Sequence, residues 1–324
     1  MAYVIFLSII GAFSGFALYI TRKEKRSFRS WSSEQMLHLR LKKGWFGASN
    51  DPVQYLAERA LINSQPYQIP TPLKLLGNVE RKEIADLDCV LLQERNGTSA
   101  TRILYLHGGA YVEQPILPHW LFLERINNQC KAIITVPLYP KAPTYTFEEG
   151  FTKIVNLYTT LLKTSSARNI VIMGDSAGGG LALALTQHIA KQKLPLPKAA
   201  ILISPWLDIT LRNADITPLE AKDPMLNRSH LQVIGRSWVG SGDPHDWRVS
   251  PINGILEGLP PLTIFVGTHE LFLADARKMR LLCKRKGVFL DYQEYPKMNH
   301  AFPLFPIPEA KKAQAKIVEI IQQA

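Results

Sequence analysis

Residues 169–190 read NIVIMGDSAGGGLALALTQHIA, and this stretch decides the fold class. Its first part is an apolar run typical of a buried strand, and its second part is rich in Ala and Leu, which helices prefer. Between them stands Gly174-Asp175-Ser176-Ala177-Gly178, the pattern G-x-S-x-G. A sharp turn from strand to helix needs glycine where the backbones approach, and it presents the central serine at a helix N-terminus. In this context the pattern predicts that Ser176 is a nucleophile.

Short apolar segments alternate with helix-length segments on both sides of this stretch. Such alternation predicts an α/β fold with a mostly parallel sheet and helices on both faces. The expected strands are 102–107, 131–138, 169–175, 199–206, 261–268 and 288–295. The expected helices are 53–62, 147–163, 178–192, 274–286 and 308–323.

Two further segments complete this pattern. Residues 84–93 are strand-like, and the turn pair Asn96-Gly97 separates them from the next strand. Residues 207–258 break the alternation with several Pro and Gly. We interpret this second segment as an insertion over the carboxyl edge of the sheet, where ligands bind in open α/β folds.

The segment His107-Gly108-Gly109-Ala110 ends an expected strand. Glycines at a strand end leave backbone N–H groups that can point into a site. The N–H groups of Gly108 and Gly109, with that of Ala177, are therefore candidates for an oxyanion hole. A plain glycine turn is the alternative.

A serine nucleophile needs a histidine base later in the chain, on a loop at the same edge of the sheet. His230 and His245 lie in the insertion, and His269 directly follows an earlier strand. His300 follows the strand over 288–295 and precedes the last helix, so it is the predicted base.

The acid that orients the base is expected at the end of a strand between the serine and the histidine. Glu270 comes directly after the strand over 261–268. Asp275 falls in the first turn of the next helix, where an acidic residue is favoured without any catalytic role. We therefore predict Glu270 as the acid and keep Asp275 as the alternative.

Composition and charge limit the remaining classes of protein. With 46% hydrophobic and 20% charged residues, the 324-residue chain is globular. The formal net charge is +11, and residues 22–43 hold eight Lys or Arg against two Glu. No zinc-finger spacing or RNA-binding signature accompanies this charge, so no nucleic-acid partner is expected. Cys89, Cys130 and Cys283 lie far apart, which indicates free thiols and no metal site.

Residues 2–20 carry no charge, and the basic run RKEKR follows at 22–26. A helix of that length, at about 1.5 Å per residue, is long enough to cross a bilayer. We therefore predict a transmembrane or signal-anchor segment over 1–21 and a single-pass membrane location. Since basic residues tend to stay on the cytoplasmic side, the catalytic part is expected in the cytoplasm. A cleaved signal peptide and an interfacial helix remain alternatives.

Taken together, these motifs resemble the hormone-sensitive-lipase-like branch of the α/β-hydrolases. The resemblance covers residues 75–305 and includes the acid, which the family position also puts at Glu270. Its motifs are HGGA at 107–110, GDSAGGG at 174–180, SPWLDIT at 204–210, DPML at 223–226, VSP at 249–251, GTHELFLAD at 267–275 and HAF at 300–302.

The resemblance implies an esterase with a small helical cap. The cap would consist of an N-terminal region at 22–70 and the insertion at 207–258, on a catalytic domain at 71–324. The implied activity is hydrolysis of carboxylic esters of small to medium acyl groups through an acyl-enzyme and a Ser-Glu-His triad. Neither a metal nor an organic cofactor is implied.

The chain departs from the family pattern beside the oxyanion loop. Ala110 replaces a third glycine, Glu113 and Gln114 replace small residues, and PLYPKAP at 137–143 differs from the common Y-R-L-A-P-E form. These departures leave the substrate range open. Acetyl amides or steryl acetates are alternative substrates, and a non-catalytic ligand-binding module on the same fold is a further alternative. The retained His300 speaks against the last of these.

Overall fold

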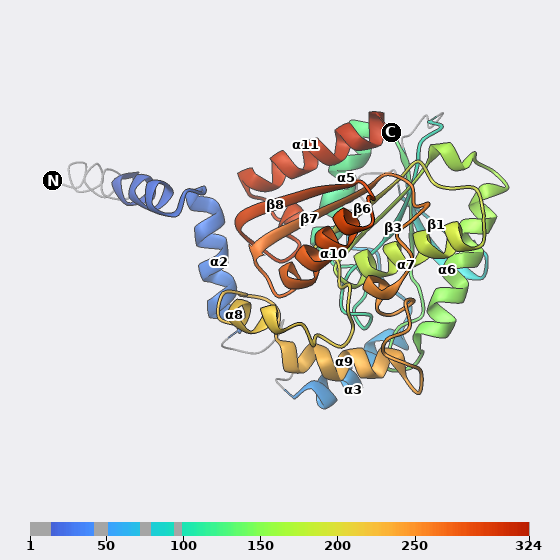
Figure 1. Cartoon of the computed structure of the whole chain (residues 1–324), viewed down its shortest axis with the longest axis horizontal. Coiled ribbons are helices and arrows are strands. Elements are labelled where there is room, and N and C mark those ends of the chain that lie inside the picture. The colour runs from blue at the N-terminus through green and yellow to red at the C-terminus, as the bar shows by residue number, and fades with distance from the viewer. Residues whose placement is uncertain (1–13, 42–50, 72–78, 94–98, 324) are drawn as a thin grey trace.

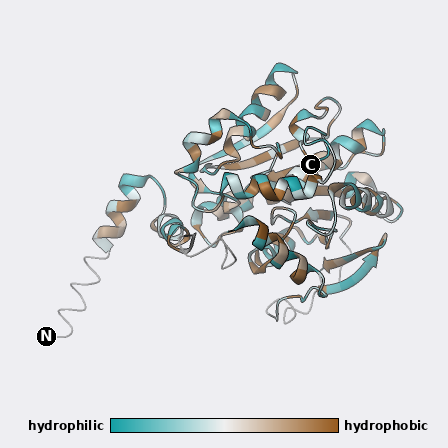
Figure 2. Cartoon of the chain, turned by 90° about the horizontal axis from the view of Figure 1, so that it is seen from below, coloured by the Kyte–Doolittle hydropathy of each residue, from teal (hydrophilic) through white to brown (hydrophobic). Residues whose placement is uncertain are grey.

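The computed structural model describes residues 14–41, 51–71, 79–93 and 99–323. Within these ranges one sheet of eight strands lies between two layers of helices (Figure 1). Hydrophobic residues gather in the inner strands of the sheet, whereas hydrophilic residues are common in its edge strands and on the helices (Figure 2). This arrangement confirms the fold class expected from the sequence.

The sheet is parallel except at one edge. β2 pairs antiparallel with β1 and with β4, and every pair from β4 to β8 is parallel. In their spatial order the strands are β1 (Val79–Ile84), β2 (Leu87–Leu92), β4 (Ile133–Pro137), β3 (Arg102–Leu106), β5 (Ile170–Asp175), β6 (Ala199–Ile203), β7 (Leu262–His269) and β8 (Leu290–Asn299). The carboxyl ends of β3 to β8 therefore meet at one edge.

Each face of the sheet has its own core. Alternate side chains point to opposite faces of a strand, so Ile172 packs in one core and its neighbour Val171 in the other. The helices α6 (Phe147–Leu162), α7 (Ala177–Lys191) and α10 (Leu273–Arg285) cover the first face. The helices α5 (Leu117–Cys130) and α11 (Pro308–Gln323) cover the second.

Further helices of the described ranges lie outside these two layers. α2 (Phe28–Leu41) and α3 (Pro52–Asn63) precede the sheet, and α8 (Thr217–Glu220) and α9 (Arg228–Val239) belong to the insertion. α3 and α9 lie side by side below the sheet in Figure 1.

Some local expectations differ from the structure. The strand expected at 84–93 is the second half of a hairpin, in which Ala85 and Asp86, both at positive φ, form the turn between β1 and β2. The turn pair Asn96-Gly97 lies outside the described residues. The helices α2 and α5 were not expected.

The predicted membrane location is wrong. Residues 14–24 are helical, whereas residues 1–13 of the apolar stretch lie outside the described residues. No helix within the described ranges is both long enough and apolar enough to cross a membrane. In the described part of the stretch Ile20 is buried and the ring of Phe16 lies edge-on to Phe28 and Trp31 of α2, whereas Leu18 and Tyr19 are exposed. The described residues therefore do not support a membrane anchor or the cytoplasmic orientation that was inferred from it.

Candidate active site

Ser176 lies in the turn between β5 and α7. Its φ of 55° and ψ of −123° are a strained conformation for a residue with a side chain. A Cβ on Gly174 would lie 2.4 Å from the carbonyl oxygen of Gly178, and a Cβ on Gly178 would lie 2.0 Å from that of Leu106. Only glycine fits at these positions, which is why the strand and the helix can approach closely. Ser176 N donates to Ile203 O at 2.8 Å and fixes the turn against β6.

His300 follows β8, and its ring lies between Ser176 and Glu270. His300 Nε2 is 2.9 Å from Ser176 Oγ, and His300 Nδ1 is 2.8 Å from Glu270 Oε2. All three residues are buried. A carboxylate only accepts hydrogen bonds, so Nδ1 carries the proton and Nε2 is left to accept one from the serine. The structure thus brings the three predicted residues into one hydrogen-bonded chain.

The surroundings of His300 strengthen it as a base. Burial disfavours the imidazolium, but the hydrogen bond and the charge of Glu270 outweigh burial, so the pKa of His300 lies above its ordinary value. The carboxylates of Asp223 and Asp175 act in the same direction. The ring of Phe272 meets the imidazole edge-on, with 5.1 Å between centroids.

Two donors bind the carboxylate oxygen of Glu270 that does not contact His300. Glu270 Oε1 accepts from Gly267 N at 2.6 Å and from Ser204 Oγ at 2.8 Å. The same Ser204 Oγ accepts from Ala301 N at 3.0 Å. Ser204 therefore ties the acid to the loop of His300, a contact that the sequence indicated only by placing Ser204 in the SPWLDIT motif.

The other candidates lie elsewhere. Asp275 is buried in the first turn of α10, where its Oδ1 accepts from Asn213 Nδ2 at 2.9 Å, and burial raises its pKa to about 6. His269 contacts Glu34, and His230 and His245 lie in the insertion. In the described ranges, no group of His, Cys, Asp and Glu could hold a metal ion.

The oxyanion loop differs from the expectation at one position. Gly108 N donates to Asp175 Oδ1 at 2.8 Å, so this N–H group is engaged and is not free for a ligand. The next two residues turn sharply, with φ of 114° at Gly109 and 53° at Ala110. Their N–H groups, and that of Ala177, donate to no acceptor in the described part of the protein.

Asp223 is a functional candidate that sequence reasoning left without a role. It lies in the DPML motif of the insertion and is buried. Its Oδ1 accepts from the backbone of Met225 and Leu226, and its Oδ2 accepts from Leu271 N, each at 2.8 Å. Burial raises the pKa of Asp223 to about 6. Asp223 thus fastens the insertion to the residue that follows Glu270.

Known proteins share both the sequence and the fold. Residues 103–304 match the family described as alpha/beta hydrolase fold. An esterase of Acinetobacter venetianus is 32% identical over 226 residues, which cover 68% of this chain and 75% of that protein. An acetyl-hydrolase of Streptomyces hygroscopicus is 31% identical over 214 residues, which cover 65% of this chain and 72% of that protein. The crystal structure of an esterase from the bacterial hormone-sensitive lipase family has a TM-score of 0.77 and 27% identity, covering 90% of this chain and 96% of that chain.

The chain belongs to the α/β-hydrolase fold family, in its hormone-sensitive-lipase-like branch. Within that family it is a carboxylic ester hydrolase.

Proposed function

We propose that Ser176, His300 and Glu270 form the catalytic triad of this esterase. Ser176 Oγ attacks the ester carbonyl while His300 Nε2 takes its proton and then returns it to the leaving alcohol. Water, activated by the same nitrogen, then hydrolyses the acyl-enzyme. Glu270 holds the imidazole in the required tautomer and stabilises its charged form. The observation that carries this proposal is the hydrogen-bonded chain from Ser176 Oγ through both ring nitrogens to Glu270 Oε2.

The oxyanion is stabilised by the N–H groups of Gly109, Ala110 and Ala177. This set replaces Gly108 of the sequence prediction by Ala110, because Gly108 N is bound to Asp175. Donors that are already in place when charge develops on the carbonyl oxygen lower the barrier without rearranging.

The proposed substrates are esters of small to medium acyl groups, as the family resemblance implies. Acetyl esters are the first group to test, since one relative is named as an acetyl-hydrolase. Acetyl amides and steryl acetates would use the same triad. Rates on esters of increasing acyl length, together with an acetyl amide, distinguish these substrates.

The cap proposed over this site is built from residues 22–70 and the insertion at 207–258. The contact between α3 and α9 supports a joint cap, because it connects the two segments. The bonds of Asp223 to the acid loop attach the insertion to the catalytic domain at 71–324.

A serine-directed fluorophosphonate tests the nucleophile directly. The protein should be labelled at Ser176 and lose its activity on p-nitrophenyl acetate. Ser176→Ala should prevent labelling and lower turnover by roughly 10⁴ or more, while the fold survives. A variant that keeps most of its activity would exclude Ser176 as the nucleophile. A folded wild-type protein that is neither labelled nor active would instead support the ligand-binding alternative.

A further inference from the structure

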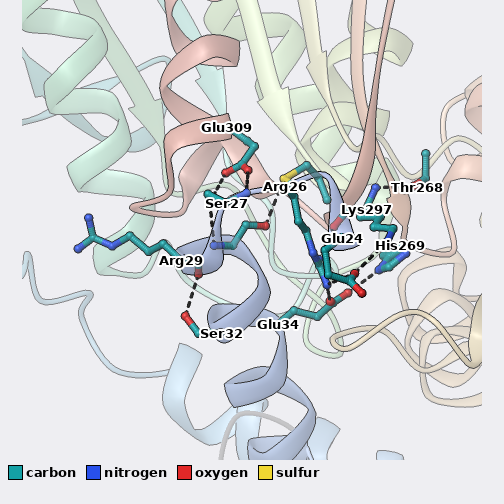
Figure 3. Close-up of polar contacts among 12 residues, drawn as sticks. Glu24, Arg26, Ser27, Arg29, Ser32, Glu34, Thr268, His269, Lys297 and Glu309 are labelled. Atoms are coloured by element: carbon teal, nitrogen blue, oxygen red, sulfur yellow. Dashed lines mark hydrogen bonds and ion pairs between the residues drawn. The ribbon is translucent and has the colours of Figure 1, made fainter. Parts of the chain in front are cut away.

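A buried ion pair and its hydrogen bonds join α2, and the bend directly before it, to the two strands that end beside the proposed acid and base. Arg26, Glu34, His269 and Lys297 make these contacts, and we call them the α2 cluster (Figure 3). Glu34 Oε1 lies 2.5 Å from His269 Nδ1, and Glu34 Oε2 accepts from Arg26 Nη2. Arg26 Nη1 donates in turn to Lys297 O at 2.8 Å. The chain segment from Arg26 to Glu34, which includes the start of α2, therefore contacts the ends of both β7 and β8.

The charge of Glu34 is held in place by its partners. The side chains of Glu34 and Arg26 are each only 4% exposed. Burial opposes ionisation, but the hydrogen bonds from His269 and Arg26 outweigh it, so the pKa of Glu34 lies below its ordinary value. A buried ion pair with further hydrogen bonds has one well-defined geometry, because each alternative leaves a charge without a partner.

The two strand ends need such support because their pairing is irregular there. The register between β7 and β8 shifts between Gly267 and His269. A Cβ on Gly267 would lie 2.1 Å from Met298 O, so the backbones are in close contact. Lys297, at φ 58°, donates from its N–H to Thr268 Oγ1 at 2.7 Å in place of a regular ladder bond.

The start of α2 is also fixed, so the helix can serve as a support. Ser27 Oγ accepts from Ser30 N at 3.0 Å and caps the helix. Ser27 N and Oγ donate to the two carboxylate oxygens of Glu309, in the first turn of α11, at 2.6 and 2.9 Å. Ser30 Oγ lies 3.6 Å from Met298 Sδ, a second contact with β8.

We propose that Glu34 is a positioning residue for the acid–base pair of this esterase. Through His269 it holds the backbone directly before Glu270, and through Arg26 it holds the backbone three residues before His300. The proposal rests on the roles proposed above for Glu270 and His300. Without the α2 cluster, the two strand ends would move relative to each other, and the contact between Glu270 and His300 would loosen.

Loosening the contact between Glu270 and His300 should change the pH dependence of the rate, which a loss of stability alone would not do. Glu270 is what raises the pKa of His300 against burial, so a weaker contact lowers that pKa. The acid limb of the pH profile of kcat/KM then moves to lower pH, because the base must be unprotonated to act. Substrate binding does not depend on this contact, so KM should change little.

His269→Ala is the main test variant, because it removes the bond to Glu34 and leaves the pair with Arg26 intact. We expect kcat on p-nitrophenyl acetate to fall about 10- to 100-fold, as for other small displacements of catalytic groups, and the acid limb to move to lower pH. His269→Asn keeps a side-chain N–H donor near the position of Nδ1 and should restore most of the activity. Glu34→Gln should resemble His269→Ala, and the double variant should lose little more than either single variant.

Glu24→Gln is the matched control. Glu24 lies on the same segment, accepts from Lys297 Nζ at 2.9 Å and pairs with Arg26 Nη2 at 3.5 Å. Its side chain is 22% exposed, and its removal leaves the bonds of Arg26 to Glu34 and to Lys297 O, and the bond of Glu34 to His269, in place. Its loss should leave kcat and the pH profile unchanged. An equal loss in Glu24→Gln, or a His269→Ala variant that only melts earlier, with unchanged kcat and acid limb, would overturn the proposal.

The triad itself is assayed in parallel. If Ser176→Ala and Glu270→Gln abolish activity while His269→Ala behaves as wild type, only the positioning role of Glu34 fails. If those two variants stay active, the proposed catalytic function fails first.

Discussion

The proposed site has an acid–base side and an oxyanion side, and a different N-terminal helix contacts each of them. The ion pairs on the two sides differ in their exposure to solvent. On the acid–base side, Glu34 of α2 pairs with Arg26 of the bend directly before α2, and the two side chains are each 4% exposed. On the oxyanion side, α3 contributes Arg59, which pairs with Glu113 at 2.9 Å, and these side chains are 16% and 23% exposed. Water and salt screen the second pair more. The same kind of contact should therefore matter more on the acid–base side.

The contacts of α3 come from one face of the helix. Tyr55, Arg59 and Asn63 are spaced four residues apart, so they point the same way. Tyr55 OH donates to Glu113 Oε1 at 2.5 Å, Arg59 Nη1 donates to both oxygens of that carboxylate, and Asn63 Nδ2 donates to Val112 O at 2.7 Å. Glu113, one of the departures from the family pattern, is thus the residue through which α3 holds the oxyanion loop.

The loop has an internal lock as well. Gly109 O accepts from Val112 N at 3.0 Å and from Glu113 N at 2.8 Å. This turn holds Ala110 and Tyr111 at φ of 53° and 64°, conformations that residues with side chains seldom adopt. The oxyanion side therefore depends less on its N-terminal helix than the acid–base side does.

Removing the acid should give the largest effect on the acid–base side. Glu270→Gln should lower kcat on the order of 10²–10⁴-fold, because the amide can leave the imidazole in the wrong tautomer. Asp275→Asn is the matched control, since Asp275 is also buried but contacts Asn213 instead of His300. Steady-state rates on p-nitrophenyl acetate compare the two variants. The reverse order of losses would move the acid to Asp275.

Disturbing the backbone donors should give the next largest effect. A Cβ on Gly109 would lie 2.6 Å from the Cβ of Glu113, so Gly109→Ala must shift the loop. We expect kcat to fall on the order of 10²-fold, with the acid limb of the pH profile unchanged, because His300 is untouched. Gly258→Ala is the control: this glycine also has a positive φ, but a Cβ there would meet nothing within 4 Å. A shifted acid limb in Gly109→Ala would show that the two sides are not separate.

The sequence could predict two kinds of feature: turns that neighbouring residues determine, and contacts that follow from the order of parallel strands. The strand–turn–helix around Ser176 was readable because the apolar run, the two glycines and the serine lie within a few residues. The pairing of His300 with Glu270 could be anticipated because parallel strands bring their carboxyl ends to one edge. The sequence also separated Glu270 from Asp275 by their places relative to the strand and the helix, as the structure has them.

What the sequence could not predict depends on distant residues. The direction of Gly108 N is set by Asp175 from another strand, so the glycine motif alone did not show which N–H groups stay free. Glu34 and His269 are 235 residues apart, and no local pattern connects them. The membrane prediction rested on the length of an apolar run alone, and no helix of the described residues is long and apolar enough to bear it out.

Removing the ion pair of α3 should have a small effect. Glu113→Gln should lower kcat roughly two- to fivefold, since a partly exposed pair contributes about 1 kcal/mol or less and the loop has its internal lock. KM and the acid limb should not change. Asp88→Asn, which breaks a pair with Arg81 on the β1–β2 hairpin, is the control for the loss of one carboxylate. A loss as large as that in His269→Ala would contradict the difference between the two sides.

The smallest effect on rate is expected for a substitution of Lys141. Unlike Arg26 and Arg59, Lys141 forms no ion pair with a carboxylate among the described residues. Lys141 is buried behind the oxyanion loop, where its Nζ donates to Tyr139 O at 2.8 Å and lies 4.9 Å from the Tyr139 ring centre. Burial lowers its pKa from 10.5 to about 7. The unfolded chain therefore binds this proton more tightly than the folded protein does. The contribution of Lys141 to the free energy of unfolding is therefore lowest below pH 7 and rises as the pH increases from about 7 to 10.5.

Lys141→Leu should remove this dependence, because leucine has no charge to bury. We expect unchanged kcat and a gain in the free energy of unfolding of a few kcal/mol at pH 6, which shrinks as the pH approaches 10. Urea unfolding across this range measures both. Lys198→Met is the control, since Lys198 Nζ also donates to a carbonyl, that of Ile321, but from a half-buried position. Its loss should leave the pH dependence as in wild type. If the free energy of unfolding of Lys141→Leu still rose above pH 7, another group would cause the rise. Lys141 would then not be a buried, unpaired cation at pH 6.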